Sequence, residues 1–168
     1  MSARMLMMLT GLLLALPVAS QECLESLSGT SSDRFRDQED GTTYDMQSGL
    51  LWSACRYGQR WSDGSCLGTS ERLTLTEALL VADDLVMAGY SGWRLPNINE
   101  LQSLVDWSCS APAINSEFFP GILSGYYLSA SARNDAGLPV MLVLDFYSGR
   151  VRDALYDKGW AMFVRDMR

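Results

Sequence analysis

One long stretch of the chain places apolar residues at helical spacing. Thr74 and Glu77 have the spacing of a capping box, which marks the start of a helix. Gly89 has the position expected of a residue that ends it. The pattern therefore predicts an amphipathic helix that packs on a core and has no chemical role. Its apolar stripe comprises Leu75, Ala78, Leu79, Ala82, Leu85 and Val86.

A second helix is indicated in the segment SGWRLPNINELQSLVDWSC, residues 91–109. Pro96 keeps the residues before it extended. Asn97 and Glu100 have the spacing of another capping box, so the helix is expected to begin directly after Asn97. It is expected to end near Trp107. Its buried face should consist of Leu101, Leu104 and Val105.

Trp93 and Arg94 lie just before this helix and are interpreted as structural residues, as are Pro96, Asn97 and Glu100. Arg94 stands between two large apolar residues, so it is either an internal strut or a site residue. An unpaired buried arginine is costly, which favours a strut bound to a carboxylate such as Glu100 or Asp106.

Short strands are predicted on both sides of the helices. The turn signals Asp40-Gly41 and Ser48-Gly49 indicate a small β meander over residues 34–52. Phe118 and Phe119 are expected in the core. Further strands follow in GYYLSAS, in LPVMLVLDF, which is apolar enough for a central strand, and in WAMFVRDM. No internal repeat is evident, and the pattern predicts one α+β domain with an antiparallel sheet.

The first twenty residues differ from the rest of the chain. Arg4 is followed by an apolar run from Met5 to Leu16, too short to span a membrane comfortably, and then by small residues. This order predicts a secretory signal peptide over residues 1–20 and a mature domain over residues 21–168. The mature chain is expected to have no membrane span and to be exported, as a periplasmic, cell-surface or secreted protein.

Four cysteines remain after that segment. An even number in an exported chain indicates two disulfides, and three pairings are possible. Cys55 and Cys66 flank a short polar loop, so this pairing is favoured, which leaves Cys23 with Cys109. A zinc site is disfavoured because the chain has no CxxC spacing and no histidine.

The absence of histidine excludes Ser-His-Asp and Cys-His catalysis, and no enzyme activity or cofactor is expected. The net charge of -7 argues against nucleic acid as a partner. A metal site is left open: Asp37, Glu39, Asp40 and Asp45 crowd one turn and could hold calcium. Solvated turn acids are the favoured interpretation, because the EF-hand spacing is missing.

The loop between Cys55 and Cys66 is rich in flat and hydrogen-bonding side chains, and a disulfide would leave it little freedom to lose on binding. Tyr57 and Trp61 are equally well interpreted as core residues. A second aromatic patch follows later in the chain. The predicted ligand-binding residues are Tyr57, Gln59, Arg60, Trp61, Tyr126 and Tyr127.

An ordered series of motifs runs along the chain: DGTTYDMQSGLLWSACRYGQRWSDGSCLG, GYSGWRLPNINELQSLVD, CSAPAIN, FFP and FVR. This series resembles the Lcl C-terminal domain family, which is named for the terminal domain of a bacterial collagen-like adhesin. The resemblance implies a fold like that of C-type lectins and formylglycine-generating enzymes, with a twisted antiparallel sheet and two helices. It also supports the pairings Cys55–Cys66 and Cys23–Cys109.

The predicted function is an exported, non-catalytic recognition module of an adhesin-like or glycan-binding kind. Flat aromatic faces and forked donors suit sugar rings and their hydroxyls. The alternative is a protein-interaction subunit of a larger cell-surface assembly, such as a pilus or secretion apparatus. The partner would accordingly be a surface glycan or an envelope protein, and the oligomeric state is left open.

Overall fold

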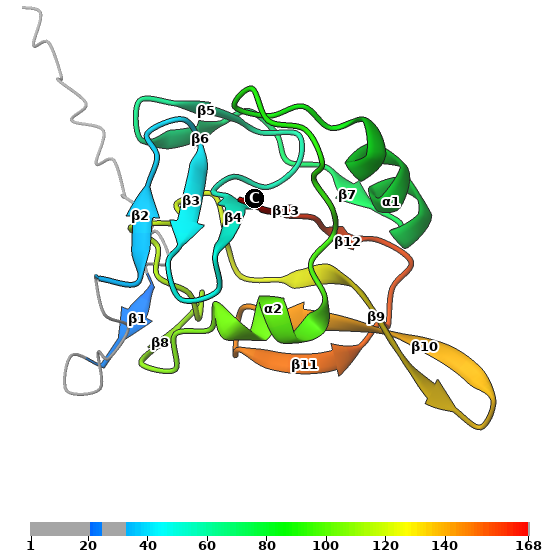
Figure 1. The fold of residues 1–168 in the computed structure, drawn as a ribbon. Helices are drawn as coiled ribbons and strands as arrows, with labels where there is room; N and C mark the ends of the chain where they lie inside the picture. Colours follow the sequence, from blue (N-terminus) through cyan, green and yellow to red (C-terminus); the bar gives the residue numbers. More distant parts are fainter. Residues whose placement is uncertain (1–20, 25–32, 168) are drawn as a thin grey trace, which may run out of the picture.

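The structure, a computed structural model, describes residues 21–24 and 33–167; the predicted signal peptide lies outside them. The described residues form short strands and two helices, so the domain is α+β, as predicted (Figure 1). The helices are α1 (Leu75–Asp84) and α2 (Ile98–Ser103). The strands are β1 (Glu22–Cys23), β2 (Phe35–Asp37), β3 (Thr42–Asp45), β4 (Leu50–Ser53), β5 (Arg60–Ser62), β6 (Ser65–Leu67), β7 (Arg72–Leu73), β8 (Cys109–Ser110), β9 (Tyr126–Asp135), β10 (Leu138–Asp145), β11 (Arg150–Asp153), β12 (Gly159–Trp160) and β13 (Val164–Asp166).

Two sheets make up most of the domain. The larger has the strand order β11-β10-β9-β12-β7, and the smaller has the order β13-β4-β3-β2. Neighbouring strands in both sheets are antiparallel, except that β12 runs parallel to β9. The two-stranded pairs β1–β8 and β5–β6 are separate from these sheets. The predicted meander corresponds to β2, β3 and β4.

β10 is an inner strand of the larger sheet, paired on both sides as its apolar run predicts, but it does not lie at the centre of that sheet. β9 occupies the centre of the larger sheet, and β10 lies one place from the edge. Only the last part of β10, from Val143 onward, is buried. Its first residues pair with the end of β9 in a hairpin arm that projects from the domain (Figure 1). Apolar composition alone does not distinguish this arm from a core strand.

Both helices begin as predicted, at capping boxes formed by Thr74 with Glu77 and by Asn97 with Glu100. The predicted apolar stripe of α1 is only partly buried: Ala78 and Ala82 face the core, whereas Leu79 is 44% exposed. The helix ends at Asp84, before the predicted Gly89. The small side chains of Ala78 and Ala82 let this helix lie close to β7 and β9. The larger leucine side chain at position 79 lies away from this contact and stays partly exposed.

The core consists of two clusters of buried side chains. One packs beneath α2 and includes Trp52, Leu101, Leu104, Phe119 and Phe146. The other packs beneath α1 and includes Leu51, Ala78, Trp93, Leu128 and Phe163. Adjacent β4 residues, Leu51 and Trp52, enter different clusters, because successive side chains of a strand point to opposite faces. The smaller sheet thus takes part in both clusters.

The segment from Trp93 to Asn97 connects the two sheets. Arg94 and Val164 of β13 exchange two backbone hydrogen bonds, each 2.9 Å long, on the side of the smaller sheet. On the side of the larger sheet, the amide of Ala130 donates to the carbonyl of Pro96 at 2.8 Å. Because Pro96 has no N–H, it is suited to a position where only its carbonyl is needed.

The Arg94 side chain is the strut that the sequence favours. Its two terminal nitrogens each donate to one carboxylate oxygen of Glu100, both at 2.8 Å. The same carboxylate accepts the backbone N–H of Asn97. Burial disfavours the charged form of Glu100, but the hydrogen bonds from Arg94 and Asn97 outweigh it and lower its pKa. The Arg94 side chain is 40% exposed, so this pair lies at the surface of the seam, which is the segment from Trp93 to Asn97 that joins the two sheets.

Two turns share the sequence D-x-x-S-G, a short repeat that the sequence analysis did not detect. In the β3–β4 turn, the Asp45 carboxylate accepts the amide of Gln47 and the hydroxyl of Ser48. In the β10–β11 turn, Asp145 accepts the equivalent groups of Tyr147 and Ser148. Each aspartate satisfies polar groups of its own turn, so the same five-residue pattern closes a hairpin in each sheet.

Asp45 differs from Asp145 in having an arginine partner. Arg34 donates through Nε and Nη2 to its two carboxylate oxygens, at 2.9 and 2.6 Å. Burial of Asp45 opposes ionisation, but the hydrogen bonds from Arg34 and Ser48 and the charge of Arg34 prevail, and its pKa is lowered. The turn therefore contains a buried, bidentate ion pair.

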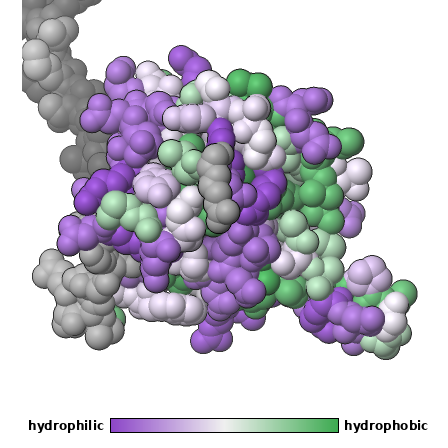
Figure 2. Space-filling view, viewed as in Figure 1, coloured by the Kyte–Doolittle hydropathy of each residue, from purple (hydrophilic) through white to green (hydrophobic). Residues whose placement is uncertain are grey.

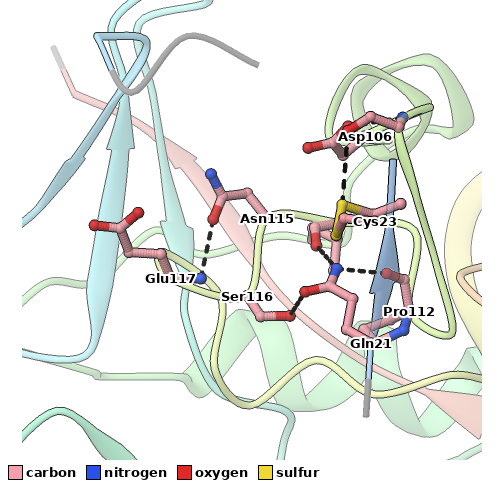
Figure 3. The surroundings of a disulfide bond; sticks show 10 residues. Gln21, Cys23, Asp106, Pro112, Asn115, Ser116 and Glu117 are labelled. Atoms are coloured by element: carbon pink, nitrogen blue, oxygen red, sulfur yellow. Dashed lines mark hydrogen bonds between the residues drawn. A yellow bond between two sulfur atoms is a disulfide. The ribbon is translucent and has the colours of Figure 1, made fainter. Parts of the chain in front are cut away.

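Both disulfides have the predicted pairing, Cys23–Cys109 and Cys55–Cys66. The first joins β1 to β8. Beside it, the Gln21 amide donates to the carbonyl of Pro112 at 2.7 Å and accepts from the Ser116 hydroxyl at 2.8 Å (Figure 3). The first described residues are thus fastened to the domain by a covalent bond and by a side-chain amide.

Replacing Glu100 should separate the two functions of its carboxylate. We expect Glu100→Ala to lower the free energy of unfolding by about 2 kcal/mol, because both the cap and the Arg94 pair are lost. Glu100→Gln keeps a capping side chain and should lower it by about 1 kcal/mol, since solvent screens the exposed part of the pair. Urea unfolding measures the decrease in the free energy of unfolding for both variants, with Asp83→Ala on the exposed surface of α1 as the control. If Glu100→Ala has the same free energy of unfolding as the wild type, the proposed structural role of Glu100 is contradicted.

Replacing Asp45 should weaken the domain and alter its response to acid. Its folded-state pKa lies below 3.8, so its contribution is complete above that value and is lost as pH falls through the folded pKa. We expect Asp45→Asn to lower stability at neutral pH by about 3 kcal/mol, because Arg34 loses its partner. The variant should also lose less stability than wild type upon acidification. Urea unfolding at a series of pH values checks both results, with exposed Asp63→Asn as the control. If the stability of Asp45→Asn and that of the wild type change with pH in parallel, this role of Asp45 is contradicted.

Candidate functional site

The β5–β6 hairpin carries most of the loop residues that the sequence singled out. The Cys55–Cys66 disulfide attaches β6 to the end of the smaller sheet, and Trp61 of β5 pairs with Cys66. Gly121 lies against the disulfide: a Cβ there would come 2.6 Å from Cys66 Sγ. The hairpin is therefore held from both sides, by the covalent bond and by the loop that contains Gly121.

A groove of about 250 Å³ opens along this hairpin. Gln59, Arg60 and Trp61 line one side. The other side is formed by the β2–β3 turn, which supplies Asp40 and Gly41, and by the segment after α1, which supplies Met87 and Ala88; Cys55 also lines the groove. Three of the four predicted loop residues thus share one surface depression, and segments far apart in the sequence complete it.

The indole of Trp61 is fixed at the edge of this groove. Its Nε1–H donates to the carbonyl of Glu39 at 3.1 Å. Its Cβ lies so close to Gly41 that a side chain at Gly41 would approach within 2.6 Å, and the positive φ of +90° at Gly41 also favours glycine. The ring is partly buried and is not part of either core cluster.

Gln59 and Arg60 bring unused hydrogen-bonding capacity to the groove. The Gln59 amide nitrogen donates weakly to the Cys66 carbonyl at 3.5 Å, and its Oε1 is buried without a partner among the described residues. Arg60 is exposed and has no ion pair within the described part of the chain. Arg60 therefore offers a free guanidinium at the groove, and Gln59 brings a lining side chain whose amide oxygen lacks a partner.

Tyr57, the fourth loop residue, packs inward. Its ring meets that of Phe163 edge-on, with centroids 6.1 Å apart, and it contacts the cluster beneath α1. The interpretation of Tyr57 as a core residue is therefore the one that the structure supports. It positions the loop without lining the groove.

The second predicted patch, Tyr126 and Tyr127, requires correction. Tyr127 is fully buried, and its hydroxyl donates to the carbonyl of Leu123 at 2.9 Å. Burial raises its pKa, against the opposing effects of the Arg56 charge and the Leu123 hydrogen bond. Alternation along β9 places Tyr126 on the opposite face, where it is half-buried near Tyr156. Tyr127 therefore cannot contact a ligand at the surface, and the two rings do not form one patch.

The acidic turn does not gather its carboxylates. In residues 21–24 and 33–167, no three histidine, cysteine, aspartate or glutamate side chains are placed to hold a metal ion. Asp45 is engaged by Arg34, whereas Asp37 and Asp40 accept hydrogen bonds within the β2–β3 turn. Asp37, Asp40 and Asp45 thus each accept a backbone N–H within a turn.

An exposed apolar groove was missed by the sequence analysis. It has a volume of about 640 Å³ and runs between α1, the β9–β10 arm and the loop before β12. Leu155 and Tyr156 are 76% and 64% exposed there. Figure 2 shows apolar residues gathered on the side of the molecule where α1 and β12 lie. No local pattern separates such residues from core residues, because their exposure depends on the packing of distant segments.

Comparison with known proteins identifies one family whose model matches most of the chain. No curated protein and no solved structure matches it. Among the described residues, neither helix has the length and apolar content needed to span a lipid bilayer. The model of the Lcl C-terminal domain family matches residues 41–168, which include both helices, the β5–β6 hairpin and every strand of the two large sheets except β2. The chain therefore belongs to the Lcl C-terminal domain family.

Proposed function

We propose that the protein is an exported, non-catalytic recognition module of an adhesin-like kind that binds glycans in the groove beside Trp61. A fold of the C-type lectin kind is part of this proposal. The observation that carries it is that a fixed indole, a free guanidinium and an amide side chain with an unsatisfied oxygen all line one groove on a cross-linked hairpin. The segment at residues 1–20 and the two disulfides support export to an oxidising compartment.

The chemistry of the groove suits a sugar. A sugar ring presents apolar C–H faces to an aromatic ring and hydroxyls to hydrogen-bonding groups around it. Trp61 supplies the ring, Arg60 supplies donors, and Gln59 supplies an acceptor whose burial without a partner is unfavourable. Because the hairpin is already fixed, binding sacrifices little conformational freedom.

The size and charge of the site narrow the ligand class. Pockets for drug-sized ligands have volumes of roughly 300–1,000 Å³, so a groove of about 250 Å³ fits one sugar unit better than a long segment of a chain. The net charge of -7 repels highly anionic polymers. The proposal is therefore recognition of a neutral or weakly charged terminal sugar.

A glycan array probed with the protein tests this assignment. We expect the double substitution of Trp61 and Arg60 by alanine to abolish the wild-type signals, because both the stacking face and the charged donors are removed. The matched control replaces Trp107 and Arg152 by alanine; both are exposed, and neither lines the groove. Equal binding by the wild type and the Trp61 and Arg60 double variant would reject the site.

A second candidate function is protein interaction within a cell-surface assembly such as a pilus or secretion apparatus. The apolar groove of about 640 Å³ beside Leu155 and Tyr156 favours it. Exposed apolar patches of this kind are typical of protein contacts. Its other apolar lining residues include Leu75, Pro139, Val140 and Met141.

Capture of complexes from envelope fractions discriminates the two functions. If the apolar groove binds a protein, Leu155→Asp should abolish co-purification of a stoichiometric partner while leaving glycan-array signals unchanged. The control Leu123→Asp changes another exposed leucine, 52% accessible and outside this groove. Recovery of the same partner with Leu155→Asp would reject this surface as the interface.

A further inference from the structure

Arg56 is a buried arginine that lacks a carboxylate partner. It is only 8% exposed, and its Nε is buried without a hydrogen-bond partner. No acidic group within the described part of the chain forms an ion pair with it. Desolvation of an unpaired charge is unfavourable, so such arginines normally have a carboxylate or a ligand at the guanidinium.

The principal contact of Arg56 is aromatic. Its guanidinium carbon lies 4.6 Å from the centroid of the Trp160 ring. This stacking compensates part of the desolvation but leaves the forked donors of the guanidinium unused. Arg56 also acts electrostatically on the buried Tyr127, because its charge opposes the rise in the pKa of that phenol. Tyr127 is committed to Leu123 and provides no counter-charge.

A second arginine faces the same ring. Trp160 pairs with Arg72 of β7 on one side and with Tyr127 of β9 on the other. Side chains at paired positions lie on the same face of a sheet, so Arg72, Trp160 and Tyr127 form a row on one face of the larger sheet. The Arg72 guanidinium carbon is 5.6 Å from the Trp160 centroid. Arg72 is exposed, and its Nη2 donates only to the Lys158 carbonyl.

The two guanidinium groups therefore stand at one indole without an acid to neutralise either of them. Mutual repulsion raises the free energy of this arrangement unless an anion lies between them. Gly125 has no side chain to cover the indole edge of Trp160, where a Cβ would lie 3.0 Å from Nε1. That N–H donates to no protein group within the described residues, so the same indole offers a third donor.

We propose that Arg56, Arg72 and Trp160 form a binding site for a carboxylate-bearing ligand. Guanidinium groups bind carboxylates through paired N–H donors, and the indole N–H adds a neutral one. A single carboxylate is favoured over a polyanion, because the net charge of -7 repels a ligand more strongly as its own charge increases. None of the three residues lines the Trp61 groove, so this inference does not rest on the proposed function.

NMR titration of ¹⁵N-labelled protein tests the site through the Trp160 indole resonance, assigned by its loss in Trp160→Phe. The probes are sodium acetate and sodium glucuronate, with glucose and sodium chloride as controls. We expect a saturable shift with a carboxylate and none with glucose or chloride. A response to acetate identifies the bare carboxylate as sufficient, and a response to glucuronate alone identifies an acidic sugar.

Substitutions locate the response. Arg56→Met keeps an apolar stem but removes the charge, and it should weaken the affinity about tenfold or more. Arg72→Met should also weaken it, and because Arg72 is exposed this variant tests the site even if Arg56→Met does not fold. The control Arg60→Met, in the Trp61 groove, should titrate as wild type. The proposal is overturned if wild type shows no carboxylate-specific shift, or if the folded Arg56 and Arg72 variants respond like wild type.

Discussion

The extended segment from Trp93 to Asn97 is the constraint on which the rest of the domain depends. Its backbone pairs with β13 of one sheet and accepts from β9 of the other, so it sets the distance between them. Glu100 fixes the segment by binding Arg94 while it caps α2. The density of unusual residues in this motif is therefore explained by architecture and does not require an active site.

The candidate surfaces lie where this architecture leaves polar or apolar groups without partners. At the β5–β6 hairpin, the disulfide holds Trp61 and Gln59 in fixed positions, so an unsatisfied acceptor can persist beside a flat ring. At Trp160, two arginines share one aromatic surface without an acid. In both places a rigid neighbour keeps an unfavourable arrangement from relaxing, which is the condition under which a ligand can relieve it.

Local sequence also explains why the two sheets end in similar turns. Asp45 and Asp145 each bind the amide two residues later and the serine hydroxyl three residues later. Only Asp45 has an arginine, because Arg34 precedes β2 and β2 pairs with β3 in that sheet. The same motif thus contributes an acid-sensitive ion pair in one hairpin and a turn without such a pair in the other.

The sequence by itself indicated the features that depend on near neighbours: both capping boxes, the turn at Ser48-Gly49, the favoured pairing of Cys55 with Cys66, and the α+β class. Tertiary structure alone decided which aromatic rings reach the surface. Tyr127 is buried and Trp61 lines a groove, although both belong to similar polar and aromatic stretches. The exposure of a residue depends on which distant segment lies against it. Met87 lines the same groove as Trp61, and the Trp160 ring lies against the Arg56 guanidinium. Such contacts join positions far apart in the chain, and no short-range periodicity records them.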